Sequence, residues 1–355
     1  MSSRVLVINA GSSSLKYQVV ELPSGTAITK GTLERISDHG VAIESMMTAL
    51  AADGVDITSV TAVGHRVVHG GELYTQPTVI DDDVIRGIES LTPLAPLHNP
   101  GNLLGIRAML HQLPAVPQVA VFDTAFHATI PAAATTYAID TNVAAQYGIR
   151  RYGFHGSSHR YVTKQAAVQL GIAVDAFNAI ICHIGNGASI TAVHNGRSVD
   201  TSMGMTPLEG LVMGSRSGDI DPGILFHLAR EAGYDIAALD ELLNRRSGLF
   251  GLTGSSDMRE VRERATAGDP AARLALDVYA YRVRKYIGAY LAVVPGVQAL
   301  VFTAGVGEND AEFRADVTEP LAHLGVGTTI PVLVIPTNEE LEIARETLTA
   351  VANRA

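Results

Sequence analysis

The sequence predicts an α/β protein built from two related domains. Apolar runs typical of strands alternate with longer stretches typical of helices, which is the pattern of α/β layers. The same strand–turn–strand pattern occurs near the start of the chain and again near its middle. With 355 residues, the chain is also long for a single hydrophobic core. These three observations favour a duplicated core in two domains.

The first copy of the pattern lies at the start of the chain. The apolar run 4–8 (RVLVI) is followed by the polar turn 9–14 and by a second apolar run, 15–22. Short apolar runs separated by Gly and Ser predict a strand, a tight turn and a second strand.

The second copy lies at 179–193. The run AIICHI is followed by a Gly-rich turn at 185–189 and by the run ITAV. A third apolar run, 299–302, leads into another Gly-rich segment at 303–309, which we also expect to be a turn.

Helices are expected between and after these strands. The stretches 160–170 and 271–293 have helical composition, and Asp269-Pro270 is a typical helix start before the second. Thr337 and Glu340 have the spacing of a capping box, so we expect Thr337 to cap a C-terminal helix.

Composition narrows the class of protein. Acidic residues outnumber basic ones, 36 to 26, so a nucleic-acid partner is not expected. The single cysteine, Cys182, excludes a disulfide framework and a zinc site built from cysteines. No apolar stretch has the length of a membrane span or the form of a secretory signal. We therefore expect a soluble, cytoplasmic protein without a membrane partner.

The Gly- and Ser-rich turns are candidate phosphate sites. Glycine lets backbone N–H groups approach an anion closely, and the segment 9–16 adds small polar side chains and one lysine. A single turn of this kind is more often a plain hairpin, but three turns after buried strands favour a nucleotide site. Neither the P-loop pattern nor the dinucleotide-binding pattern of glycines is present.

Two arginines lie in glycine-rich segments that we expect to be loops. Arg66 lies within 64–71 between two histidines, and Arg216 lies within 213–222. Arginine binds carboxylate or phosphate through two parallel hydrogen bonds. The alternative for either residue is a surface salt bridge, which the surrounding Gly and Ser make less plausible.

Two pairs of histidines have the spacing of zinc ligands on one helix face. They are His65 with His69 and His155 with His159. Neither pair has the glutamate that follows the first histidine in a zinc hydrolase. Hydrogen-bonding structural histidines are therefore the favoured interpretation.

Nine segments resemble the acetokinase family and occur in that family's order. They are VLVINAGSSSLKYQVV, GHRVVHGG, LAPLHNP (94–100), VFDTAFHATIP (121–131), YGFHGSSH, HIGNGAS, MGSRSGDIDP, TAGVGEN and PTNEE (336–340). The family is a branch of the actin-like ATPase and sugar-kinase superfamily. The resemblance implies a two-domain duplicated fold with the nucleotide in the interdomain cleft.

The resemblance also implies an activity. Its members transfer a phosphoryl group reversibly between ATP and acetate, giving acetyl phosphate and ADP by direct in-line transfer. It implies Mg²⁺ as cofactor, with Mn²⁺ as a substitute, and a homodimer. The implied domains are 1–123 with 340–355, and 124–339, the second binding the nucleotide and forming the dimer.

Individual roles follow from the same resemblance. The implied catalytic residues are Asp123, His155, Arg216 and Arg66, and the implied metal ligands are Asn9 and Glu339. The implied acetate pocket consists of Arg66, Val68, Leu97, Phe154 and Pro207. The implied nucleotide-binding residues are Ser12, Ser14, Lys16, His183, Ile184, Gly185, Asn186, Gly187, Asp257, Met258, Arg259, Gly305, Val306, Gly307, Glu308 and Asn309.

Three other functions are weighed against this one. A propionate or butyrate kinase would share most of these residues. A non-catalytic actin-like ATP sensor would need the phosphate turns but not the combination of catalytic residues, and a zinc hydrolase lacks a third ligand. The chain is shorter than the family pattern between Lys30 and Gly64 and between Asn309 and Pro336, while every motif remains.

Overall fold

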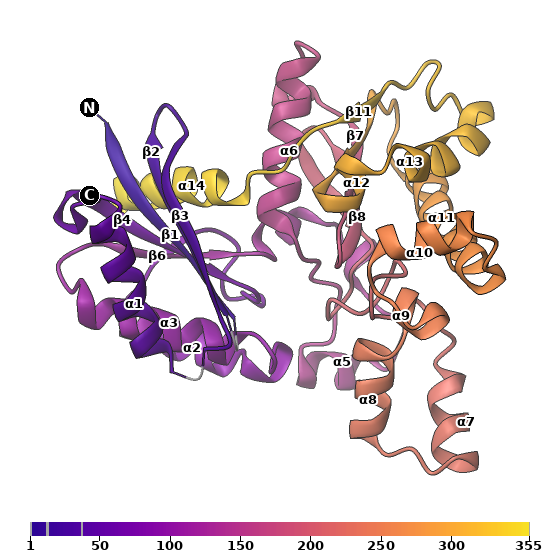
Figure 1. Ribbon diagram of the computed structural model, residues 1–355, viewed down its shortest axis with the longest axis horizontal. Helices are drawn as coiled ribbons and strands as arrows, with labels where there is room; N and C mark the ends of the chain where they lie inside the picture. Colours follow the sequence, from indigo (N-terminus) through magenta and orange to yellow (C-terminus); the bar gives the residue numbers. More distant parts are fainter. Residues whose placement is uncertain (1, 12–13, 37, 355) are drawn as a thin grey trace. The chain divides into compact units, whose positions relative to one another are not determined.

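The computed structural model describes residues 2–11, 14–36 and 38–354. The chain divides into two compact units, each containing one sheet, and Figure 1 shows both. Unit 1 comprises Met1–Ala128, Gly156–Tyr161 and Asn338–Ala355, and unit 2 comprises Thr129–His155 and Val162–Thr337. The domain boundaries implied by the resemblance, 123/124 and 339/340, stay a prediction.

Unit 1 is built on a six-stranded sheet with the order β3-β2-β1-β4-β6-β5. Its strands are β1 (Ser3–Ala10), β2 (Ser14–Leu22), β3 (Thr26–Glu34), β4 (Val60–Val67), β5 (Thr78–Val79) and β6 (Gln118–Phe122). The first three form an antiparallel meander, and β4 and β6 continue the sheet in parallel with β1.

Helices cover both faces of this sheet, and the side chains of β1 point alternately to one face and to the other. Leu6 and Ile8 pack with residues of α1 (His39–Ala52) and α3 (Asn99–Gln112), whereas Val5 and Val7 pack with α14 (Glu339–Arg354). Successive strand residues point to opposite faces, so a strand buried on both sides reads as one apolar run. Figure 1 shows α14 on one side of the sheet and α1 and α3 on the other. The remaining helix, α2 (Asp82–Ser90), packs on α3.

Unit 2 repeats the order and directions of β3, β2, β1, β4 and β6. Its strands are β7 (Ala179–Ile184), β8 (Ala188–His194), β9 (Arg197–Thr201), β10 (Ala299–Thr303) and β11 (Val332–Val334). The order β9-β8-β7-β10-β11 again joins an antiparallel meander to two parallel strands. The shared strand order supports the duplicated core expected from the two similar sequence patterns.

The helices of unit 2 carry most of its candidate site. They are α4 (Ala132–Thr135), α5 (Thr141–Tyr147), α7 (Gly223–Glu231), α8 (Ile236–Arg245), α9 (Gly248–Thr253), α10 (Met258–Thr266), α11 (Pro270–Val293), α12 (Ala304–Asn309) and α13 (Ala311–Thr318). One further helix, α6 (Gly156–Gln169), begins in unit 1 and continues in unit 2.

The strands expected at 4–8, 15–22, 179–184 and 190–193 and the helices at 160–170 and 271–293 are confirmed, with Asp269 capping α11. Residues 12 and 13 of the turn expected at 9–14 lie outside the described residues. Three local expectations were wrong. The segment 304–309 forms the short helix α12, because one residue with positive φ, Ala304, turns the chain directly into a helix. Arg66 lies on strand β4, not in a loop. The first turn of α14 is capped by Asn338, whose Oδ1 accepts a hydrogen bond from Leu341 N–H at 3.0 Å, and not by Thr337.

Candidate active site

Parallel strands bring polar residues of unit 1 to one edge of its sheet. Asn9 and Arg66 lie near the carboxyl ends of β1 and β4, and Asp123 directly follows β6. These three strands are parallel, so their carboxyl ends lie at the same edge. That edge is where open α/β sheets usually bind ligands.

Arg66 and Asp123 form a bidentate ion pair. Arg66 Nε donates to Asp123 Oδ1 at 2.9 Å, and Nη2 donates to Oδ2 at 2.6 Å. Burial alone would lower the pKa of Arg66, but the charges of Asp123 and Glu339 raise it above its ordinary value. Arg66 is therefore in a salt bridge, but not in the surface salt bridge of the alternative expectation. The bridge is largely buried, with the carboxylate 1% exposed, and it joins two residues to which the resemblance gives catalytic roles.

A small polar cavity lies beside this pair. Its volume is about 150 Å³, and it is lined by Val7, Asn9, Lys16, Tyr17, Arg66, Glu339, Glu340 and Ile343. Lys16 lies opposite Asn9 in the β1–β2 pairing, and Glu339 begins α14. The structure thus brings both implied metal ligands to one cavity of unit 1. Ser12 lies outside the described residues, and Ser14 accepts a hydrogen bond from Gly11 at the start of β2.

The charges around this cavity suit a cation. Burial raises the pKa of Glu339 to about 7, and Asp123 and Glu340 add to the shift against the opposing effect of Arg66 and Lys16. Within residues 2–11, 14–36 and 38–354, no three His, Cys, Asp or Glu side chains form a ready metal cage. Mg²⁺ needs no such cage, because it binds through one or two carboxylates and keeps several waters. The oxygen donors present therefore fit magnesium.

Two buried asparagines of α3 position the end of β4, a role that the sequence did not reveal. Asn102 Oδ1 accepts from Val68 N–H at 3.1 Å, while its Nδ2 donates to the carbonyl of Ala10 at 2.6 Å. Asn99 exchanges two hydrogen bonds with the backbone of His69. Asn102 thus connects the ends of β1 and β4. The only sequence signal was two asparagines three residues apart, which does not identify their partners.

In unit 2, His155 occupies a constrained position at the start of α6. Its φ is +57°, which is uncommon for a residue other than glycine and is often found at functional sites. Its Nδ1 lies 2.9 Å from Ser189 Oγ, and its ring stacks on His183 with centroids 4.2 Å apart. These contacts fix the direction of the imidazole.

Arg216 differs from Arg66 in its electrostatic surroundings. Its Nη1 donates to the carbonyl of Pro207 at 3.1 Å, and burial lowers its pKa. Among the residues that the structure describes, no carboxylate pairs with Arg216. A partly buried cation without a counter-ion is costly, so this guanidinium suits a bound anion.

His155 and Arg216 meet at Gly187. A Cβ atom at Gly187 would lie 3.5 Å from His155 Nε2 and 3.6 Å from Arg216 Nη1. Both side chains therefore border the same point of the Gly-rich turn between β7 and β8. The structure brings together these two catalytic residues implied by the resemblance, within one unit.

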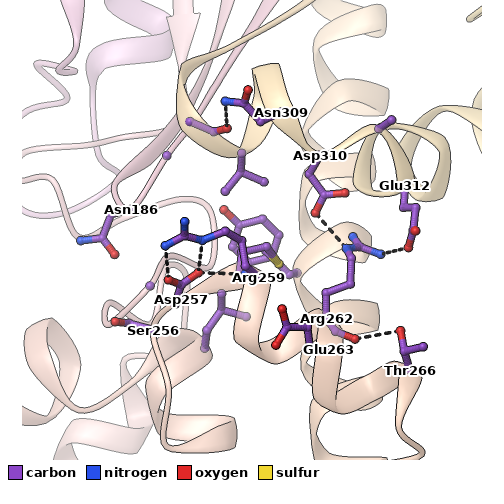
Figure 2. Close-up of a pocket in the computed structure, with 18 residues that line it drawn as sticks. Asn186, Ser256, Asp257, Arg259, Arg262, Glu263, Thr266, Asn309, Asp310 and Glu312 are labelled. Carbon is purple, nitrogen blue, oxygen red and sulfur yellow. Dashed lines mark hydrogen bonds and ion pairs between the residues drawn. The ribbon is translucent and has the colours of Figure 1, made fainter.

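A second, larger cavity of about 1200 Å³ lies in unit 2 (Figure 2). Eight of the residues implied to bind nucleotide line it: Gly185, Asn186, Asp257, Met258, Arg259, Gly305, Val306 and Asn309. These residues come from three segments far apart in the sequence. Because Gly185 and Asn186 directly precede Gly187, one end of the cavity lies next to the site of His155 and Arg216.

The other implied nucleotide residues of unit 2 do not line this cavity. They are His183, Ile184, Gly187, Gly307 and Glu308. Glu308 Oε1 accepts hydrogen bonds from Ala304 N–H at 2.7 Å and Thr337 N–H at 3.1 Å, so this carboxylate fastens the start of α12. Ile184 and Gly307 are packed inside the unit.

Sequence reasoning missed ten of the eighteen residues that line this cavity. The additional lining residues are Gly214, Leu249, Ser256, Arg262, Glu263, Thr266, Tyr279, Asp310, Ala311 and Glu312. Five of the ten lie on α10 and α13, whose mixed charges are typical of solvent-exposed helix faces. Tyr279 is buried, and its place within the long apolar pattern of α11 gave no sign of a cavity.

The residues implied to hold the substrate methyl group divide between the units. Val68 and Leu97 belong to unit 1, where Val68 is half-buried and Leu97 is exposed. Phe154 and Pro207 belong to unit 2, where Phe154 is buried and Pro207 is half-buried.

The first histidine pair, His65 and His69, takes structural positions. His65 lies on a strand, so the helix-face spacing expected for His65 and His69 does not exist. His65 Nε2 lies 2.8 Å from Gln118 Oε1, and burial lowers the pKa of His65 to about 4. His69 Nδ1 accepts a hydrogen bond from Gly71 N–H. His155 contacts Ser189 and His183, as described above.

Comparison with known proteins identifies relatives of this chain. Residues 29–330 match the model of the acetokinase family. An acetate kinase from Leifsonia xyli subsp. xyli is 52% identical over 394 aligned positions, covering 99% of each chain. Those positions outnumber the 355 residues of this chain, so the relative has residues that this chain lacks.

Solved structures extend the comparison. The crystal structure of Porphyromonas gingivalis acetate kinase has a TM-score of 0.94 and 40% identity, covering 98% of this chain and 100% of its own. A propionate kinase from Francisella tularensis has a TM-score of 0.93 and 38% identity, covering 98% and 99%. ROK-family proteins share the fold alone, which is that of actin-like ATPases and sugar kinases. No helix in the described part of the chain is long and apolar enough to cross a membrane.

Proposed function

The chain belongs to the acetokinase family, and we propose that it transfers a phosphoryl group reversibly between ATP and acetate, giving acetyl phosphate and ADP. One observation carries the proposal beyond family membership. At Gly187, the imidazole of His155 and the guanidinium of Arg216 lie next to one end of a cavity large enough for a nucleotide.

His155 and Arg216 would act on the phosphoryl group. Phosphoryl transfer requires little covalent work from a protein and depends on positioning and on charge stabilisation. Arg216, which has no carboxylate partner in the described chain, would donate to the phosphoryl oxygens as they gain charge. His155 would donate from Nε2, because its Nδ1 is engaged by Ser189. The group would pass directly from ATP to the acetate oxygen, in line and without a covalent enzyme intermediate.

Arg66 would orient the acetate carboxylate. Its Nε and Nη2 are committed to Asp123, which leaves the Nη1 donors for a substrate oxygen. Asp123 would keep this guanidinium fixed. The methyl group of acetate would contact Val68, Leu97, Phe154 and Pro207, an assignment that rests on the resemblance.

We assign the metal to the small cavity of unit 1. Asn9 and Glu339 would hold Mg²⁺, with Mn²⁺ as a substitute, through their oxygen atoms. When bound, the ion supplies positive charge that neutralises phosphate oxygens. Lys16 and Ser14, with Ser12, would contact phosphate from the β1–β2 turn, and the cavity residues of unit 2 would hold the nucleoside.

Two further features are proposed, the dimer on the resemblance and the location on composition. We propose a homodimer and a cytoplasmic location, and the single cysteine is compatible with a reducing compartment. Sedimentation equilibrium of the purified chain tests the dimer. A single species with the mass of one chain would contradict it.

A propionate kinase is the second candidate. The Francisella tularensis propionate kinase matches the structure almost as well as the Porphyromonas gingivalis acetate kinase does. Hydroxylamine trapping of the acyl phosphate, run with ATP, Mg²⁺ and each of acetate, propionate and butyrate, distinguishes the two. We expect the highest kcat/KM with acetate, a lower value with propionate and a poor one with butyrate. Preference for propionate favours the second candidate, and no trapped product with any acid contradicts both.

A further inference from the structure

The large cavity of unit 2 lies between two walls that are distant in sequence. Helix α10 forms one wall, and α12 with the start of α13 forms the other. Each wall packs on α11, and the two walls carry different segments proposed for nucleotide binding. The width of the cavity therefore depends on what fixes α10 relative to α12 and α13.

Arg262 links the two walls directly, as Figure 2 shows. From α10, its Nε donates to Asp310 Oδ2 at 2.9 Å and its Nη1 to Glu312 Oε2 at 2.9 Å. Asp316 Oδ2 lies 3.6 Å from the same Nη1. One guanidinium thus binds three carboxylates of the opposite wall.

The contact with Asp310 is the important one of the three. Both partners are largely buried, the Arg262 side chain being 18% exposed and that of Asp310 16%. Glu312 is 75% exposed, so its contact is screened by water and contributes little.

Asp310 also lies between the two helices of its wall, α12 and α13. It ends α12, and its Oδ1 accepts from Phe313 N–H at 2.8 Å, which caps α13. The Phe313 ring packs edge-on against the Tyr279 ring of α11, with the ring centroids 5.6 Å apart. This aromatic contact holds α13 on α11, and the ion pair of Arg262 with Asp310 holds the side of the wall that lines the cavity.

We propose that Arg262 is a positioning residue for nucleotide binding, because its ion pair with Asp310 holds the two walls at the separation that fits the nucleotide. The inference rests on the proposed function, since it assumes that the cavity receives ADP and ATP. Arg262 acts through the walls and takes no part in the transfer itself. Its loss therefore affects nucleotide affinity more than turnover.

Two single variants test both ends of the contact. Arg262→Met keeps an unbranched side chain without the charge. Asp310→Asn removes the charge while the side-chain oxygen can still cap α13, since asparagine caps helices as well as aspartate does. Each variant is expected to weaken ADP binding about tenfold, and the double variant to be no weaker than either single one, because both remove the same interaction.

A matched control lies on the same helix. Arg264 of α10 pairs with Asp269 at 2.6 Å and does not line the cavity. Arg264→Met breaks a comparable ion pair and should leave ADP affinity unchanged. If breaking an ion pair of α10 weakened ADP binding only by destabilising the helix, Arg264→Met would weaken ADP binding as well.

The measurement is isothermal titration of each full-length protein with ADP and Mg²⁺, together with steady-state kinetics. We expect a raised KM for ATP, a kcat within about twofold of the wild type and an unchanged KM for acetate. Equal ADP affinity in wild type, Arg262→Met and Asp310→Asn would overturn the inference, as would an equal loss in Arg264→Met. A wild-type protein that binds no ADP would instead overturn the proposed function.

Discussion

Arg216 and Arg66 carry the same charge in opposite surroundings, and this difference predicts different defects. Arg216 has no carboxylate partner among the described residues, so it is available for charge that develops during transfer. Arg216→Ala should lower kcat by a few hundredfold, equivalent to roughly 3–4 kcal/mol of barrier. ADP affinity should change little. Steady-state kinetics beside the exposed control Arg230→Ala would measure this, and a kcat within twofold of wild type would contradict the assignment.

Arg66 should fail differently, because Asp123 already shares its charge. Loss of Arg66 removes a donor to the substrate carboxylate and leaves Asp123 buried without its partner. Arg66→Ala should therefore raise the KM for acetate about tenfold in addition to lowering kcat. The double variant Arg66→Ala with Asp123→Asn removes the unpaired charge and should regain thermal stability without regaining acetate affinity. An unchanged KM in both variants would return Arg66 to a purely structural role.

Val68 tests substrate choice at the scale of one side chain. A β-branched residue is stiff, so Val68 should limit the depth of the pocket proposed for the methyl group. Each methylene in such a pocket contributes only about 1–3 kcal/mol. Val68→Ala should accordingly raise the ratio of kcat/KM for propionate to that for acetate. If Val68 is only a packing residue, truncation lowers stability and affects both acids equally, so an unchanged ratio decides against the assignment.

The role of a residue could be predicted where a sequence motif identifies it. It could not be predicted where the role depends on a contact with a residue distant in the sequence. The motif around Arg216 gave the arginine but not its lack of a counter-ion, which depends on the whole of unit 2. Asn102 and Arg262 were missed because their partners lie 34 and 48 residues away in the sequence. A single sequence contains no information that pairs them.

At the scale of elements, His65 links neighbouring strands through Gln118 and gives the fold a pH dependence. Burial lowers the pKa of His65 to about 4, so the folded protein binds fewer protons than the unfolded chain between that value and 6.5. Stability from this residue is complete above pH 6.5 and is lost as the pH falls towards 4. Between pH 7.5 and pH 5 the loss should be about 2 kcal/mol.

Calorimetry of the wild type and His65→Gln at those two pH values measures this contribution. The melting temperature of the wild type should fall by several degrees more than that of the variant, which has no titrating group at this position. Equal falls in the two proteins would show that His65 does not titrate on unfolding as described.

Elements were predictable where local pattern and packing agree. The apolar runs of β1 and β7 are buried on both faces, and a Gly-rich turn follows each, so length and composition identify them. The segment after β10 was misassigned because Gly305 and Gly307 disfavour a helix, whereas tertiary contacts and the Glu308 carboxylate stabilise α12. The cap of α14 was misplaced by one residue, a usual uncertainty at helix ends.

At the scale of the whole molecule, two units repeat one strand order with different polar residues at the sheet edge. Unit 1 presents carboxylates and an amide beside Arg66, and unit 2 presents the Gly-rich turn and the large cavity. The first two strands of each sheet follow from the repeated sequence pattern. The contents of the two sites do not, because they depend on residues outside the repeats, such as Glu339 and Asp257.

Metal removal tests the chemistry proposed for unit 1. Chelation of divalent ions should abolish transfer, and Mg²⁺ should restore it, because Asn9 and Glu339 offer oxygen donors. Glu339→Gln should raise the Mg²⁺ concentration for half-maximal activity about tenfold or more, since it removes the charged ligand. Full activity in chelator, or restoration by Zn²⁺ alone, is incompatible with this site.

The central claim is that this chain moves the terminal phosphoryl group of ATP to acetate. Phosphorus NMR of the wild type with ATP, Mg²⁺ and acetate follows every phosphorus-containing product at once. We predict that ADP and acetyl phosphate accumulate together from the first time points, and that Arg216→Ala slows both equally. Formation of ADP with inorganic phosphate and no acetyl phosphate, or no consumption of ATP, would contradict the account.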